Sequence, residues 1–146
     1  MCGIVGLKVF SEEALSDLNK LDLAVKSLNK RGPDHQESRR YENIGLAHAR
    51  LSIIDTSDAA HQPFEDETQR YVITFNGEIY NFKEIRQELK QLGFEFRTES
   101  DTEVLLKSFI HWGKECLHKF NGFFAFSILD KVKEELFLTR DRFGIK

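Results

Sequence analysis

The sequence is poor in the residues that build disulfide-stapled or membrane-embedded proteins. Only two of its 146 residues are cysteine, and Cys2 and Cys116 lack the spacing of a metal-binding or redox pair. A single disulfide between them stays open, but reduced thiols fit better. No apolar run approaches the roughly 20 residues of a membrane-spanning helix, and Glu12 and Glu13 arrive before an N-terminal signal peptide could complete its apolar core. We therefore expect a cytoplasmic protein with no membrane partner.

An excess of basic charge is also missing. The formal net charge is −3, with 21 Lys and Arg against 24 Asp and Glu, so nucleic acid is not an expected partner. Charged residues make up 31% of the chain and hydrophobic residues 40%, which is typical of a globular domain. We find no repeat or linker and expect one domain over residues 1–146. Because residues 140–146 follow a predicted strand without a closing element, we expect this domain to be cut from a longer chain.

Hydrophobic spacing and turn residues predict a mixture of strands and helices. Leucines at spacings of three and four mark a first helix, which Ser11 is expected to cap and Gly32 to end in a left-handed conformation. Ser100 and Glu103 have the spacing of a capping box. We predict strands at residues 2–10, 43–54, 70–75, 94–97, 122–130 and 135–140, helices at 12–30, 82–92 and 100–112, and a loop at 56–69. This pattern indicates an α+β fold with mainly antiparallel sheets.

Cys2 follows the initiator methionine, which is an unusual place for a packing residue. Removal of Met1 would leave a first residue that carries both a thiol and a free α-amine. These two groups titrate close to each other above neutral pH, so the amine can act as general base toward the thiol without a histidine partner. We therefore interpret Cys2 as a candidate nucleophile. On this position alone, an incidental cysteine at the start of a strand is an equal alternative.

Asn76 and Gly77 are candidates to hold the oxyanion that acyl transfer creates. Such a charge needs hydrogen-bond donors fixed where it develops, and an asparagine amide followed by a glycine N–H supplies two. Glycine also allows a close approach of the backbone. The plainer interpretation is an Asn-Gly turn between a strand and a helix, and it would prevail without Cys2.

Arg50, Asp101 and Glu78 carry charges that match the two ends of an α-amino acid. A guanidinium can clamp a carboxylate with two parallel hydrogen bonds, and either acidic side chain can accept from an ammonium group. Each residue also has a structural interpretation. Arg50 would be a surface arginine at a strand edge, and Asp101 a favourable negative charge at a helix N-terminus.

Metal and phosphate chemistry have little support in the sequence. No glycine-rich phosphate loop is present, and the five histidines have no zinc-like spacing. We therefore expect no metal and no cofactor in this domain. His48 is interpreted as a packed strand residue. The five are His35, His48, His61, His111 and His118.

Six motifs, taken in order, resemble one known family. They are Cys2-Gly3-Ile4-Val5-Gly6, Arg31-Gly32-Pro33-Asp34, Arg50-Leu51-Ser52-Ile53-Ile54-Asp55, Asn76-Gly77-Glu78-Ile79-Tyr80-Asn81, Ser100-Asp101-Thr102-Glu103 and Arg140-Asp141-Arg142-Phe143-Gly144-Ile145-Lys146. The series is similar to the glutaminase domain of the class II (N-terminal nucleophile) glutamine amidotransferases. Within that group it most resembles glutamine-hydrolysing asparagine synthetase. Each motif is weak or moderate alone, but six in order are highly specific.

The resemblance implies a fold and a catalytic apparatus. The fold is the N-terminal nucleophile (Ntn) hydrolase fold, a four-layer αββα sandwich with two antiparallel sheets. Cys2, freed of Met1, would attack the side-chain amide of L-glutamine and form a thioester, with its own amine as base. The Asn76 side chain and the Gly77 N–H would form the oxyanion hole.

The resemblance also implies how glutamine would be held. Arg50 would bind the α-carboxylate, and Asp101 and Glu78 the α-ammonium. Residues 31–34 would support the site as a loop. Backbone groups lining the pocket would come from Leu51, Ser52, Ile53 and Ile54.

In the family, the ammonia passes to a C-terminal synthetase domain that amidates aspartate, and we expect ATP and magnesium only there. By itself this chain is expected to hydrolyse glutamine to glutamate and ammonia. Ala49, Ala59 and Ala60 depart from the family pattern, which leaves room for a different ammonia acceptor. A catalytically silent binding module and an Ntn peptidase or acylase are further alternatives. A homodimer is compatible with the sequence.

Overall fold

The computed structural model describes residues 2–146, and the expected removal of Met1 falls outside this part. The described chain forms two antiparallel sheets. The first has the order β1-β3-β2 and the second the order β4-β5-β6-β7. The strands are β1 (Gly3–Lys8), β2 (His35–Tyr41), β3 (Ile44–Arg50), β4 (Phe64–Glu65), β5 (Tyr71–Ile79), β6 (Gly122–Asp130) and β7 (Glu135–Arg140).

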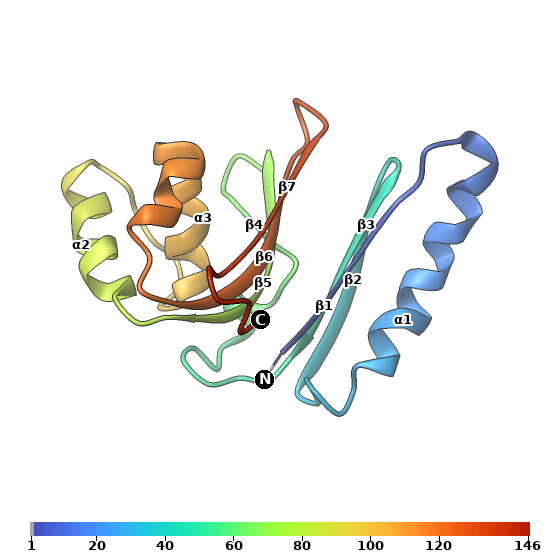
Figure 1. Cartoon of the computed structure of the whole chain (residues 1–146), viewed down its shortest axis with the longest axis horizontal. Coiled ribbons are helices and arrows are strands. Elements are labelled where there is room, and N and C mark those ends of the chain that lie inside the picture. Colours follow the sequence, from blue (N-terminus) through green and yellow to red (C-terminus); the bar gives the residue numbers. More distant parts are fainter. Residues whose placement is uncertain (1) are drawn as a thin grey trace.

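Helices cover the outer face of each sheet. Figure 1 shows α1 beside the sheet of β1, β2 and β3, and α2 and α3 beside the sheet of β4 to β7, with the two sheets between them. The α+β prediction with antiparallel sheets is therefore confirmed. The helices are α1 (Leu21–Ser27), α2 (Phe82–Gln91) and α3 (Asp101–Trp112), with the 3₁₀ segments η1 (Glu12–Lys20), η2 (Asp58–Ala60) and η3 (Gly113–His118).

The central strands are buried on both faces because each sheet lies between a helical layer and the other sheet. Successive side chains of a strand point to opposite faces. In β5, Ile73 and Phe75 pack with α2 and α3, whereas Val72 packs with Leu46 of the other sheet. This double burial explains why residues 71–75, the first part of β5, are mostly apolar.

β3 is buried along its whole length because it is the central strand of the smaller sheet. Ala47 packs against α1, and Leu46 packs against the larger sheet. By the same alternation, His48 and Arg50 point inward between the sheets. The alternation of β3 thus places two polar side chains on the same inward face as Leu46.

The predicted elements are mostly recovered, with three errors in the strands. The strand predicted at residues 94–97 is wrong: these residues form no strand, and Phe94 and Phe96 pack beside the core of α2 and α3. β2 was not predicted because its half-exposed edge position carries mainly polar residues. β4, within the predicted loop, was too short to show a pattern.

The predicted Asn76-Gly77 turn is also wrong. Both residues lie inside β5, which runs on to Ile79 because it stays paired with β6 as far as Gly122. Gly77 is required there by close approach: a Cβ would lie 2.2 Å from the Phe123 carbonyl oxygen. Strand pairing therefore overrides the local turn preference of Asn-Gly.

The helix predicted at residues 12–30 is divided into η1 and α1, and its expected caps are not found. Ser11 makes no side-chain cap hydrogen bond. Gly32 does not have a positive φ; its glycine is needed because a Cβ would lie 2.1 Å from the Ala49 carbonyl carbon. The Ser100 cap is confirmed, since its hydroxyl accepts from the Glu103 N–H over 3.3 Å.

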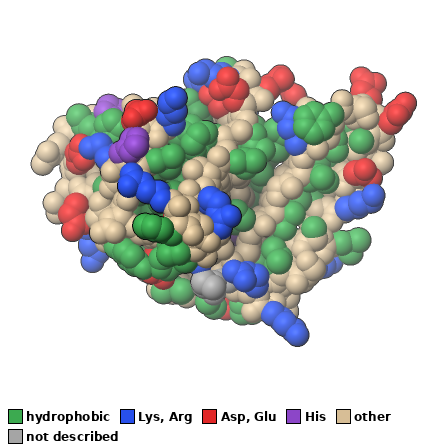
Figure 2. Space-filling view, viewed as in Figure 1, with side chains coloured by type: hydrophobic (Ala, Val, Ile, Leu, Met, Phe, Trp, Pro, Cys, Tyr) green, Lys and Arg blue, Asp and Glu red, His purple; other side chains and the backbone are tan. Residues whose placement is uncertain are grey.

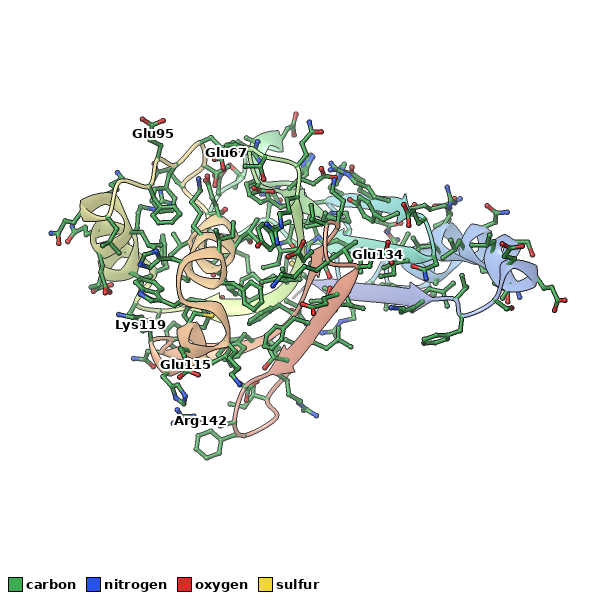
Figure 3. All side chains as sticks on the ribbon, turned by 90° about the horizontal axis from the view of Figure 1, so that it is seen from above. Glu67, Glu95, Glu115, Lys119, Glu134 and Arg142 are labelled. Atoms are coloured by element: carbon green, nitrogen blue, oxygen red, sulfur yellow. The ribbon has the colours of Figure 1, made fainter. Side chains whose placement is uncertain are left out.

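The surface is divided between charged and apolar regions. Figure 3 shows Glu95, Glu115 and Arg142 pointing away from the fold. Between the edge strands β1 and β7 lies an apolar hollow of about 590 Å³, and hydrophobic side chains are visible along it in Figure 2. No helix in residues 2–146 is long and apolar enough to cross a bilayer.

Candidate active site

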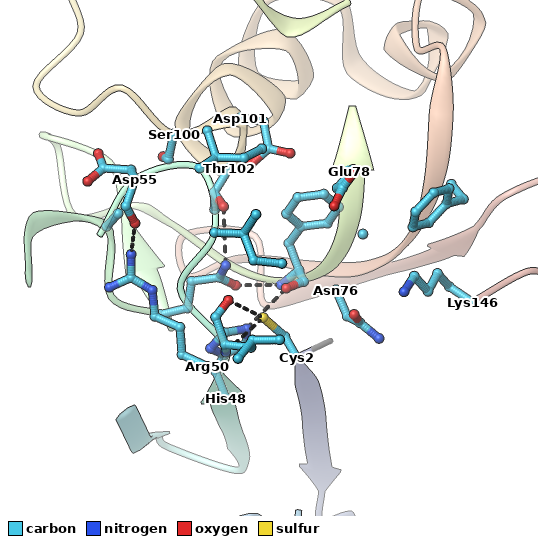
Figure 4. A pocket seen from close by; sticks show the side chains of 18 residues that line it. Cys2, His48, Arg50, Asp55, Asn76, Glu78, Ser100, Asp101, Thr102 and Lys146 are labelled. Carbon is cyan, nitrogen blue, oxygen red and sulfur yellow. Dashed lines mark hydrogen bonds between the residues drawn. The ribbon is translucent and has the colours of Figure 1, made fainter. Parts of the chain in front are cut away.

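One cavity of about 100 Å³ collects most of the sequence-predicted site residues. Cys2 precedes β1, Arg50 ends β3, Asn76 and Gly77 belong to β5, and Asp101 begins α3. Figure 4 shows these elements converging, with Asn76 between Cys2 and Lys146 in that view. Glu78, Leu51, Ile53 and Ile54 also line the cavity.

Strand pairing places the thiol of Cys2. Gly3 pairs with Ala49 in the antiparallel ladder of β1 and β3, so the residue before β1 lies beside the residues that follow β3. The Leu51 N–H donates to Cys2 Sγ over 3.4 Å, and the thiol faces the Leu51 carbonyl oxygen at 3.6 Å. Arg31 Nε donates to the Cys2 carbonyl oxygen over 3.2 Å. The nucleophile candidate is therefore held by backbone groups on both sides.

β4 pairs only with Val72 and Ile73, so the side of β5 that faces away from β6 is open beyond these residues. This open edge decides where the Gly77 N–H points. In an antiparallel strand, the backbone groups of alternate residues point to opposite neighbours. Phe75 uses both of its groups on the side away from β6: its N–H donates to Gln62 Oε1 over 2.6 Å, and its carbonyl accepts from His48 Nε2 over 3.1 Å. The Ile79 N–H donates to Asp101 Oδ2 on the same side over 3.2 Å. Gly77, between them, therefore directs its N–H toward the cavity.

Arg50 is tied to the loop that follows its own strand. Its guanidinium donates to the carbonyl oxygens of Ser57, over 2.9 Å, and of Asp55. A guanidinium has five N–H donors, so these two bonds leave others for a bound carboxylate. Arg50 thus lines the cavity and also wraps residues 51–57 around itself.

Asp101 occupies the first turn of α3, beside the Ser100 cap. Burial raises the pKa of its carboxyl to about 6, the neighbouring charge of Glu78 acts in the same direction, and the hydrogen bond from the Ile79 N–H opposes them. A buried acidic group with a raised pKa beside a cavity is typical of functional sites. A positively charged ligand would therefore stabilise the charged form of the Asp101 carboxyl most strongly.

Ser52 is the exception among the predicted pocket residues, since it is not part of the cavity lining. Its N–H instead donates to Asp34 Oδ2 over 2.8 Å, while the Asp34 N–H donates to the Arg50 carbonyl oxygen over 3.0 Å. Together with the contact of Arg31 to Cys2, these bonds place residues 31–34 directly behind the site.

His48 and Gln62 line the cavity and were not predicted as site residues. A carbonyl can only accept, so His48 Nε2 carries the proton in its bond to Phe75, and no group in residues 2–146 bonds Nδ1. Burial lowers the pKa of His48 to about 4, which keeps the ring neutral. Gln62 Nε2 also donates to Thr102 Oγ1 over 3.1 Å. The sequence around either residue gives no indication that it belongs to the site, because its hydrogen-bond partners are distant in the sequence.

Lys146 lines the cavity from the last motif in the chain. Asp141 organises this segment: its carboxylate accepts from the backbone N–H groups of Phe143, Ile145 and Lys146. Burial lowers the pKa of Lys146, and the nearby charge of Arg31 acts in the same direction. The motif was quoted from the sequence, but only its folded turn shows that its lysine reaches the site.

Comparison with known proteins identifies the family. The whole chain, residues 1–146, matches the family model described as the glutamine amidotransferase domain. The chain therefore belongs to the glutamine amidotransferase domain family, and it is a class II domain related to glutamine-hydrolysing asparagine synthetases.

Three curated relatives illustrate this relationship. The chain is 37% identical over 150 residues to glutamine-hydrolyzing asparagine synthetase 3 of Bacillus subtilis, of which it covers 24%. It is 43% identical over 150 residues to synthetase 1 of the same organism, covering 23%. It is 39% identical over 165 residues to a putative asparagine synthetase of Methanocaldococcus jannaschii, covering 31%. Each alignment covers 100% of this chain, which thus spans about a quarter to a third of these relatives.

A solved structure has a similar fold. The glutamine phosphoribosylpyrophosphate amidotransferase from B. subtilis, complexed with ADP and GMP, superposes with a TM-score of 0.57 and is 25% identical. The match covers 70% of this chain and 24% of that one.

Proposed function

We propose that this chain hydrolyses the side-chain amide of L-glutamine to glutamate and ammonia through a thioester on Cys2. The observation that carries the proposal is the single cavity lined by Cys2, Arg50, Asn76, Gly77 and Asp101. These residues come from both sheets and from α3. The layer order of helix, sheet, sheet and helix in Figure 1 supports assignment to the Ntn-hydrolase fold.

The first half-reaction forms the thioester. The α-amine of Cys2, freed by removal of Met1, takes the thiol proton, and sulfur attacks the δ-carbonyl carbon of glutamine. The carbonyl oxygen becomes an oxyanion, which the Asn76 amide and the Gly77 N–H stabilise. The oxyanion then collapses, the carbon–nitrogen bond breaks, and the leaving nitrogen takes the proton from the α-ammonium to depart as ammonia.

The second half-reaction returns the enzyme. The Cys2 amine takes a proton from a water molecule, whose oxygen attacks the thioester carbon. The same donors hold the second oxyanion, the carbon–sulfur bond breaks, and the thiolate regains its proton. Both steps use only groups of this chain, so we propose that the half-reaction needs no metal or cofactor.

Charge complementarity supports α-amino acid recognition. The Arg50 guanidinium would hold the α-carboxylate, while Asp101 and Glu78 would hold the α-ammonium. Leu51, Ile53 and Ile54 line the cavity between these charges, whereas the contribution of Ser52 is confined to its bond with Asp34.

We further propose that residues 1–146 form the glutaminase domain of a longer chain. Its C-terminal synthetase domain would use ATP and magnesium to amidate aspartate with the ammonia. Support comes from the asparagine synthetase relatives, of which this chain covers about a quarter to a third. A different acceptor is the alternative, and the sequence after Lys146 distinguishes the two.

The decisive experiment measures glutamate release from glutamine. Cys2→Ala is expected to abolish release, whereas Cys116→Ala is the matched control. Cys116 is fully buried, and burial raises the pKa of its thiol to about 12, so it is inert as a nucleophile. Wild-type protein that lacks Met1 and still releases no glutamate would favour a catalytically silent homologue.

A further inference from the structure

Three side chains form a cluster outside the cavity lining. His35 begins β2, Glu37 lies two residues further on the same face, and His61 follows η2. The His35 and His61 rings are stacked, with centroids 3.5 Å apart, and His35 Nε2 lies 3.3 Å from Glu37 Oε2. One nitrogen or oxygen atom of each residue lies within 4.8 Å of the others. The proposed glutaminase mechanism uses none of them.

We propose that His35, Glu37 and His61 bind one divalent transition-metal ion of the zinc class. Imidazole nitrogen and carboxylate oxygen are ligands that zinc accepts at about 2.0–2.2 Å. Ligand atoms around a tetrahedral ion of this size lie about 3.4 Å apart, which is close to the present separation of His35 Nε2 and Glu37 Oε2. The site is independent of the proposed glutaminase activity.

The ligand side chains have to rotate in order to converge on one ion. The two stacked rings have to splay so that both nitrogen lone pairs point at one ion. Their side chains are 31% and 22% exposed, which leaves room for this rotation. Asp58, whose side chain is 98% exposed and lies 3.5 Å from His61 Nε2, can turn in as a fourth ligand.

Neighbouring charges set the strength of the site. Arg39 Nε donates to Glu37 Oε1 over 2.7 Å and leaves Oε2 toward His35. Arg50 is a second nearby arginine, since it pairs with His35 across β2 and β3. The two nearby arginines repel a cation, so binding is expected to be weaker than at a closed structural zinc site.

The ion would connect two segments that matter for the cavity. His35 pairs with Arg50 across β2 and β3. His61 lies in the segment between β3 and β4, whose carbonyl groups at Asp55 and Ser57 hold the Arg50 guanidinium. A bound ion would therefore fasten this segment to the smaller sheet and raise the melting temperature.

The experiment is a zinc titration by calorimetry, combined with thermal melting, on protein that carries Cys2→Ala. This background removes a half-buried thiol that would itself bind zinc. One zinc equivalent is expected to bind and to raise the melting temperature. His61→Ala and Glu37→Gln should each weaken binding by about 10-fold or more, since even indirect supports of a metal site are worth that much. Zinc that binds elsewhere on the protein contributes equally to the parent and to the variants, so it does not affect the difference between them.

His118→Ala is the matched control. His118 lies 3.6 Å from Glu115 but is not part of any three-residue cluster found within residues 2–146. The His118→Ala variant should bind zinc with the same affinity as the Cys2→Ala parent. Circular dichroism establishes that each variant is folded. Absence of zinc binding by the parent, equal binding by folded His61→Ala and Glu37→Gln, or an equal loss in His118→Ala would each overturn the proposal.

Discussion

The sulfur of Cys2 lies against both polar backbone groups of Leu51, with the N–H 3.4 Å away and the carbonyl oxygen 3.6 Å away. Because β1 and β3 fix these residues, the thiol is positioned by strand pairing and not by a neighbouring side chain. The N–H stabilises negative charge on sulfur as it develops. The contacts with the Leu51 backbone orient the sulfur independently of the α-amine that we propose as its base.

The role of Asn76 can be separated from glutamine binding. Asn76→Ala removes one oxyanion donor, which typically costs about 10²–10³ in kcat, and should leave KM nearly unchanged. Steady-state kinetics of glutamate release measure both constants. Asn43→Ala, in the exposed turn between β2 and β3, is the control. A wild-type kcat for Asn76→Ala would remove this residue from the oxyanion hole.

Arg50 is expected to contribute mainly to substrate affinity. Charge-assisted hydrogen bonds are worth about 1.5–3 kcal/mol, so Arg50→Ala should weaken glutamine binding about 10- to 100-fold. Calorimetry on the Cys2→Ala background measures this without turnover. Hydrogen exchange at residues 52–60 should also accelerate, because the carbonyl groups of Asp55 and Ser57 lose their partner. Arg40→Ala, which removes an exposed ion pair with Asp22 and a hydrogen bond to the Leu18 carbonyl oxygen, should change neither measurement.

Glutamine binding is expected to depend on pH through Asp101. Its pKa is raised to about 6 by burial, so the carboxylate is charged above pH 6 and gains a proton as the pH falls. Only the charged form pairs with an ammonium, so affinity should be full above pH 7 and decline below pH 6. Because a bound ammonium stabilises the carboxylate, the midpoint in the complex should lie below that of the free protein.

Calorimetry of the Cys2→Ala protein between pH 5 and 8 tests this dependence. Asp101→Asn should bind weakly at every pH and show a flat profile. If the parent profile were equally flat, Asp101 would not be the ammonium acceptor.

Gly77 should be intolerant of a side chain. A Cβ there would lie 2.2 Å from the Phe123 carbonyl oxygen and 2.7 Å from the Phe124 Cα, so Gly77→Ala must push β5 from β6. We expect a loss of about 1–3 kcal/mol in unfolding free energy, measured by urea denaturation. Gly6→Ala provides the comparison, since its Cβ would meet only Leu46 Cδ2 at an ordinary 3.7 Å. Equal destabilisation of the two variants would contradict the packing account.

The proposed base is the α-amine of Cys2, so active protein should lack Met1. Intact mass spectrometry checks this directly. A variant with an uncleaved N-terminal extension should bind glutamine but release little glutamate, since its Cys2 nitrogen is an amide. Full activity of the extended form would require another base.

Much of the fold could be predicted from the sequence because its signals are local. The apolar spacing of α2, the Ser100 cap that begins α3 and the hairpin of β6 and β7 each depend on neighbours a few residues apart. The role of Cys2 as a nucleophile was likewise predicted from its place beside Met1, and it stays a prediction. The roles assigned to Arg50 and Asp101 stay predictions until they are measured.

The tertiary structure alone decided features that join distant parts of the chain. Asn76 and Gly77 are extended because pairing with β6 outweighs their turn preference. The open edge of β5, satisfied at Phe75 by His48 and Gln62, directs the Gly77 N–H to the cavity. His35 and His61, 26 positions apart in the sequence, stack only when β2 meets the loop before β4. Strand pairing and loop packing depend on long-range contacts, which hydrophobic periodicity over a few residues does not encode.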